Sequence, residues 1–122
     1  AIDYLEFIGW KEITEREEML TAQLLAGMKK IPGVHILGSG DEKEHCGIVS
    51  FTVDDVHPHD IASILDEAHV AVRAGHHCAQ PLLEWLGISS CARASVAFYN
   101  TPEDVGRFLD QLAQVRRMMG YE

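Results

Sequence analysis

The chain has 122 residues, of which 47% are hydrophobic and 24% charged, and its formal net charge is -9. These values are typical of one globular domain covering residues 1–122. The acidic balance argues against a nucleic-acid partner and against an anionic membrane surface, because both attract basic proteins. No run of about 18 apolar residues predicts a membrane span. No basic segment followed by an apolar run predicts a secretory signal.

The cysteine content indicates a reducing compartment. Cys46, Cys78 and Cys91 form an odd set at irregular spacing, which argues against a disulfide framework and favours a cytoplasmic protein. The chain begins at Ala1 without a methionine. This start is compatible with simple removal of the methionine or with a piece of a longer protein.

Two helices are predicted before residue 33. Apolar residues indicate a short opening helix over 2–8 that ends near Gly9. Thr14 and Glu17 have the spacing of a capping box, in which each side chain would bond the other's backbone amide, so the second helix is predicted to begin at Thr14. Pro32 and the following glycine end it. Its apolar stripe consists of Met19, Leu20, Leu24, Leu25 and Met28.

The remaining chain predicts four strands and three helices. In chain order these are strands over 34–37 and 47–53, a helix from Pro58, a strand over 70–73, a short helix over 81–86, a strand over 92–98 and a helix from Thr101 with an apolar stripe reaching Met119. Short strands mixed with helices that must cover one face predict an α+β fold, a two-layer sandwich with a small, mostly antiparallel sheet.

The segment 73–81, Arg-Ala-Gly-His-His-Cys-Ala-Gln-Pro, carries the strongest chemical signal. It places Cys78 in a loop between a strand and a helix, directly after His76 and His77. A thiol reacts as the thiolate, so it needs solvent access and a nearby base or cation. Because alternate side chains of an extended loop diverge, at most one imidazole is expected to contact the sulfur. The alternative is a partly exposed cysteine with incidental histidines.

Arg93 is the second candidate, because it lies in a strand of small residues that leave room beside it. A guanidinium in such a place can hold a carboxylate or phosphate through two parallel hydrogen bonds. The alternative is a structural ion pair with one of the chain's 19 acidic residues. Arg73, at the start of the cysteine loop, could bind the same anion or brace the turn.

Other polar residues give weaker signals. His57 and His59 are spaced like a pair of metal ligands, but no third and fourth ligand follow at matching spacing, so no metal site is predicted. The adjacent ligands His76, His77 and Cys78 would not converge readily on one tetrahedral ion. Cys46 and Cys91 are interpreted as small core or edge residues.

The segment 73–81, together with Ala-Arg-Ala-Ser at 92–95 and Tyr-Asn-Thr at 99–101, resembles the C-terminal part of group II cysteine desulfurases. These enzymes are the selenocysteine lyase-like branch of the class V aminotransferases and depend on pyridoxal 5'-phosphate (PLP). The resemblance covers the whole chain. It implies the C-terminal small domain of a fold type I PLP-dependent transferase.

The resemblance also implies roles for individual residues. Cys78 matches the cysteine that attacks the sulfur of the substrate L-cysteine and carries the persulfide, and L-selenocysteine is the alternative substrate that the resemblance implies for the full-length enzyme. Arg93 matches the arginine that holds the substrate carboxylate. Arg73, His76 and His77 match active-site loop residues. For the full-length enzyme it implies a homodimer that releases alanine and passes sulfur to an acceptor protein for iron–sulfur cluster assembly.

The cofactor of the family is expected to bind elsewhere. PLP is held by a Schiff-base lysine, and none of the four lysines here lies in the sequence context that the family uses. Without this electron sink the C–S bond has no route to break. The chain alone is therefore predicted to bind no PLP and to lack desulfurase activity. Two alternatives are a stand-alone sulfur-relay module that accepts persulfide on Cys78, and a structural domain in which Cys78 is inert.

Overall fold

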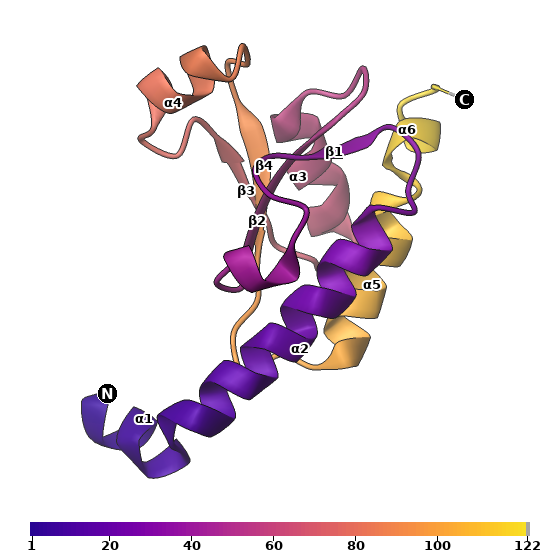
Figure 1. The fold of residues 1–122 in the computed structure, drawn as a ribbon. Coiled ribbons are helices and arrows are strands. Elements are labelled where there is room, and N and C mark those ends of the chain that lie inside the picture. Colours follow the sequence, from indigo (N-terminus) through magenta and orange to yellow (C-terminus); the bar gives the residue numbers. More distant parts are fainter. Residues whose placement is uncertain (122) are drawn as a thin grey trace.

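A computed structural model describes residues 1–121 as a mixed α and β structure (Figure 1). In chain order its elements are α1 (Ile2–Ile8), α2 (Trp10–Met28), β1 (Val34–Ile36), η1 (Glu42–Glu44), β2 (Ile48–Val53), α3 (Pro58–Glu67), β3 (Arg73–Gly75), α4 (Gln80–Trp85), β4 (Cys91–Ser95), α5 (Pro102–Leu112) and α6 (Val115–Met118). The predicted α+β fold is confirmed. Within the described residues, no helix combines the length and the apolar character needed to cross a membrane.

The four strands form one antiparallel sheet in the order β1-β2-β4-β3. Helices α2, α3 and α5 cover one face of this sheet and supply most of the buried core (Figure 1). The long helix α2 lies beside α5, and α3 packs against β3 and β4. The other face of the sheet is therefore left for the short α4 segment and for solvent.

Alternation along the strands decides which side chains reach each face. Val49 and Phe51 of β2 and Ala92 and Ala94 of β4 are buried in the core. Successive residues of a strand point to opposite faces, so the residues between these four point to the outer face. The register sets Ser50 of β2 opposite Arg93 of β4 on that outer face. The Arg93 side chain therefore points to the face of the sheet that the three large helices do not cover.

The second helix begins earlier than predicted. It starts at Trp10, directly after Gly9, whose φ of 98° lies in the left-handed region and separates the helix from α1. The apolar stripe extends back to Ile13, which is buried, so Thr14 lies inside the helix and is exposed. Glu17 does not close a capping box and instead accepts a hydrogen bond from the Phe98 amide at 3.2 Å.

Three other boundaries differ from the predictions. Pairing of β3 with β4 begins only at Arg73, opposite Arg93, so the β-branched residues before it are not in the strand. The strand predicted over 92–98 stops at Ser95, because Asn100 closes a turn by accepting the Ala97 amide at 2.9 Å. The final helix is interrupted after Leu112, and its last turn is the separate helix α6.

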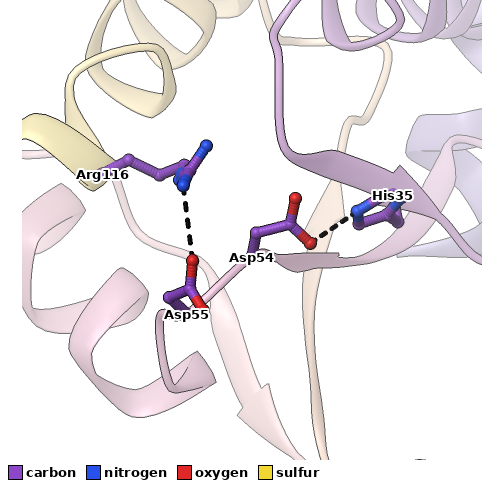
Figure 2. Close-up of polar contacts among 4 residues, drawn as sticks. All are labelled: His35, Asp54, Asp55 and Arg116. Atoms are coloured by element: carbon purple, nitrogen blue, oxygen red, sulfur yellow. Dashed lines mark hydrogen bonds and ion pairs between the residues drawn. The ribbon is translucent and has the colours of Figure 1, made fainter. Parts of the chain in front are cut away.

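Two polar contacts join the turn after β2 to neighbouring elements (Figure 2). His35 of β1 lies 2.7 Å from the carboxylate of Asp54, and Arg116 of α6 donates to Asp55 at 3.3 Å. These groups are largely exposed except for Arg116. Exposed pairs contribute little free energy, so they orient the turn more than they stabilise the fold.

The capping box of this chain lies at α5, where the sequence also predicts a helix start. The Thr101 hydroxyl accepts from the Asp104 amide at 3.2 Å, and the Asp104 carboxylate accepts from the Thr101 amide at 2.9 Å. We expect Thr101→Ala to lower the free energy of unfolding by about 1 kcal/mol in urea titrations. Thr14→Ala is the matched control, because alanine is favoured inside a helix, and it should cost nothing. Equal losses from both substitutions would contradict this assignment.

Candidate functional site

A cavity of about 460 Å³ opens on the outer face of the sheet, between β2, β4 and α4. Most of its wall is apolar, and Arg93 is the only lysine or arginine among its lining residues, all of which lie in the described part of the chain. The lining residues are Leu37, Gly38, Ile48, Ser50, His76, His77, Ala79, Leu82, Leu83, Trp85, Leu86, Cys91 and Arg93. An apolar cavity with one cation is suited to a small ligand that carries an anionic group.

The Arg93 side chain is half-buried in this wall and has an unsatisfied donor. Its Nε atom is buried and makes no hydrogen bond within residues 1–121. The ion-pair alternative finds no support, since no carboxylate of the described residues forms a salt bridge with Arg93. A buried donor without a partner is costly, and a bound carboxylate or phosphate would satisfy it.

Cys78 is exposed and is not itself among the lining residues of the cavity. Its two neighbours, His77 and Ala79, both line the cavity. Residues of the cysteine loop on both sides of Cys78 therefore line the same cavity as Arg93. Because Cys78 is exposed, a reactant as large as a second protein can reach it.

The backbone at Cys78 adopts an unusual turn. His77 and Cys78 have φ values of 55° and 56°, and the Ala79 amide donates to the His76 carbonyl at 2.9 Å. Positive φ at both central residues is the pattern of a type I′ turn, which strongly favours glycine and asparagine. Each residue held in this region costs about 1–3 kcal/mol. Such strain is found mainly where function requires it.

Both histidines of the loop bond to backbone rather than to the sulfur. His76 Nδ1 lies 3.1 Å from the Cys78 amide nitrogen and must accept its proton. His77 Nε2 lies 3.2 Å from the Cys91 carbonyl oxygen and must donate to it. Burial lowers the pKa of His77, and the charges of Arg93 and Arg73 lower it further against the opposing effect of the carbonyl. The His77 imidazole is therefore neutral near pH 7.

Cys91 is a second thiol in the cavity, but its chemistry differs from that of Cys78. It is 1% exposed, and burial raises its pKa, while the Ser50 side chain and Arg93 act in the opposite direction. A thiol that keeps its proton is a poor nucleophile. The interpretation of Cys91 as a core residue agrees with this burial, whereas Cys46 is exposed just before β2.

The raised pKa of Cys91 predicts a loss of stability at alkaline pH. Above the pKa of an unfolded thiol, near 8.5, the unfolded chain releases this proton while the folded chain keeps it. The free energy of unfolding must then fall as pH rises through that window. We expect the difference in stability between the parent and Cys91→Ala to shrink from pH 7.5 to pH 10 in urea titrations. A constant difference would contradict the raised pKa.

The remaining predicted residues lie in different places. Arg73 is exposed and pairs with Arg93 across β3 and β4, so both arginines share the outer face. His57 and His59 stack with ring centroids 5.4 Å apart at the start of α3. No group of three potential metal ligands occurs in the described residues.

Sequence reasoning gave no site role to the apolar residues of and after α4. Leu82, Trp85 and Leu86 line the cavity and are also exposed, Trp85 by 81%. A tryptophan close to a candidate nucleophile is a signal that the sequence does contain, since Trp85 follows Cys78 by seven positions. Ser50 was also missed, although alternation along β2 predicts its outward direction.

Comparisons with known proteins show what the whole chain is similar to. The sequence model described as Aminotransferase class-V matches residues 1–108. A probable cysteine desulfurase of Staphylococcus aureus is 47% identical over all 122 residues, and one of Staphylococcus epidermidis is 45% identical. The chain spans 29% of the length of each relative. The apo structure of a cysteine desulfurase from Thermococcus onnurineus is 39% identical and superposes with a TM-score of 0.91, over 96% of this chain and 29% of that chain.

Proposed function

Because this chain belongs to the class-V aminotransferase family, we propose that it is the sulfur-accepting domain of a PLP-dependent cysteine desulfurase. In the reaction, Cys78 attacks the sulfur of L-cysteine. The carbon–sulfur bond breaks and a sulfur–sulfur bond forms on Cys78. The bonding electrons remain with the carbon fragment, which takes up a proton and leaves as alanine. The balanced products are alanine and a Cys78 persulfide.

One juxtaposition carries this proposal: an exposed thiol whose two sequence neighbours line a cavity, and in the wall of that cavity a half-buried arginine whose buried Nε has no hydrogen-bond partner in the described residues. Arg93 would hold the α-carboxylate of the substrate by two hydrogen bonds. Orienting the substrate in this way is a large part of catalysis, because the reacting atoms must be close and aligned. The apolar remainder of the wall would exclude water from the bound substrate.

The residues of this chain do not fit the cofactor. No lysine lines the cavity, so the site offers no amine for a Schiff base. Lys29 donates to the Gly40 carbonyl, and Lys11 pairs with Glu15 on the same helix. We therefore propose that PLP is held by the part of a complete desulfurase that this chain does not span. With L-cysteine and added PLP, the 122-residue chain should release no alanine, and measurable turnover would refute this assignment.

A sulfur-relay module is the second candidate function. It is favoured by the exposure of Cys78 together with the absence of a lysine in the cavity wall, because accepting sulfur from a persulfide needs neither a Schiff base nor a carboxylate site. The two functions make different demands on Arg93. A relay should tolerate its replacement, whereas a desulfurase domain should not.

The test of the shared claim is sulfur loading of the 122-residue chain. We expect incubation with a small-molecule persulfide donor to add one sulfur atom to Cys78, detected by mass spectrometry of peptides. Cys46 is an internal control, because it is also exposed but, unlike Cys78, has no immediate sequence neighbour in the cavity lining. Equal loading of Cys46 and Cys78 would mean that exposure alone explains the reaction. Cys78→Ser should abolish the loading at this position.

The proposed function also implies a location, an oligomeric state and a protein partner for the complete enzyme. We propose that the complete enzyme is a cytoplasmic homodimer that acts on L-cysteine or L-selenocysteine. Its persulfide would pass to an acceptor protein and support iron–sulfur cluster assembly. The exposed apolar residues Leu82, Trp85 and Leu86 beside Cys78 support the presence of a protein partner, because such patches often mark interaction sites.

A further inference from the structure

The turn that carries Cys78 has a conformation which its own residues do not favour. Neither His77 nor Cys78 is a glycine or asparagine, yet both have left-handed φ values. A single backbone hydrogen bond, from the Ala79 amide to the His76 carbonyl, closes the turn. Interactions outside that bond must therefore stabilise the turn against relaxation to a more common backbone geometry.

His76 supplies the first interaction. Its Nδ1 atom accepts the Cys78 amide proton at 3.1 Å, two residues along the chain. This contact fixes the backbone of the nucleophile itself. It has the form of an Asx turn, in which an asparagine side-chain oxygen accepts from the amide two residues later. Asparagine could therefore replace His76 in this contact, whereas an apolar side chain could not.

His77 supplies the second interaction. Its Nε2 atom donates to the Cys91 carbonyl of β4 at 3.2 Å. This bond ties the tip of the turn to the strand that carries Arg93, two residues further along. Because β4 lies between β2 and β3, the anchor is a central strand of the sheet. The neutral state of His77 fits this role, since one ring nitrogen donates and no charge is placed next to the two arginines.

We propose that His76 and His77 are positioning residues, which hold the Cys78 turn in its strained conformation and fix the thiol relative to Arg93. This inference rests on the proposed function of Cys78 as the sulfur acceptor. In this proposal neither imidazole removes the proton from the Cys78 thiol. His76 orients the Cys78 backbone, and His77 anchors the turn to β4.

The test measures amide hydrogen exchange by NMR in the 122-residue chain. We expect His76→Leu to speed exchange at the Cys78 amide about fivefold, and His77→Leu to do so at the Ala79 amide, as for one lost hydrogen bond. His76→Asn and His77→Gln retain an acceptor and a donor and should restore the parent rates. If leucine unfolds the chain, alanine at the same positions takes its place.

A second measurement separates positioning from proton transfer. The pH profile of Cys78 alkylation, recorded in a Cys46→Ser background, should keep its midpoint in His76→Asn and His77→Gln. A shifted midpoint would overturn the proposal in favour of a base, as would parent-like exchange in both leucine variants. If the exchange rates or the pH profile contradict the positioning role, persulfide loading of Cys78 in the parent chain would be unaffected. Failure of sulfur loading in the parent would instead reject the proposed function, whatever the exchange rates show.

Discussion

Arg93→Leu should lower kcat/KM for L-cysteine about 30- to 150-fold in a complete desulfurase that contains this chain. If Arg93 holds the substrate carboxylate as proposed, the substitution removes a charge-assisted contact worth about 2 to 3 kcal/mol, and each 1.4 kcal/mol corresponds to about a tenfold change. A suitable protein is a chimera in which this chain replaces the matching segment of the probable cysteine desulfurase of Staphylococcus aureus, with which it shares 47% identity. Alanine release measures the rate.

Two control variants make the result specific. Arg93→Lys retains the charge but not the planar pair of donors, so it should recover only part of the lost rate. Arg117→Leu removes an exposed arginine of α6 and should leave kcat/KM unchanged. A value for Arg93→Leu within twofold of the unsubstituted chimera would contradict carboxylate binding. Such a result would favour the relay function, for which the cavity cation is dispensable.

The sequence predicted the elements of the site better than their boundaries. Alternation along β4 places Arg93 on the face opposite Ala92 and Ala94, and this direction can be read from the sequence because strand periodicity is a local property. The ends of β3 and β4 were not predictable in this way. They depend on which residues of the two strands meet, and the β-branched composition before Arg73 gives no information about its partner. Likewise, Thr14 and Glu17 fit a capping pattern that packing of Ile13 overrides.

The conformation of the cysteine loop was also beyond sequence reasoning. Gly75 has a φ of 131°, in a region that glycine adopts without strain, so its backbone is no surprise. The left-handed residues that shape the turn are His77 and Cys78, which carry no such signal. Their conformation depends on contacts with Cys91, 14 residues away along the chain. The exchange measurements at the Cys78 and Ala79 amides report directly on how mobile this loop is.

The largest effect on stability is expected at Phe51, whose side chain is fully buried between the sheet and α5. Its ring meets Phe108 edge-to-face, with centroids 6.0 Å apart. Phe51→Ala should lower the free energy of unfolding by about 3–5 kcal/mol, because it removes buried apolar area and leaves a cavity. This is a large part of the 5–15 kcal/mol typical of a whole domain. Urea titration followed by circular dichroism measures the loss.

Phe7→Ala provides the matched control, since this phenylalanine of α1 is 87% exposed. It should change the free energy of unfolding by less than about 0.5 kcal/mol. Phe51 and its cross-strand partner Ala92 directly adjoin, along β2 and β4, the outward-facing pair Ser50 and Arg93. Loss of packing on the inner face should therefore disturb the strands that carry the site on the outer face. Similar effects of the two substitutions would mean that α1, rather than the sheet and its three covering helices, stabilises the fold.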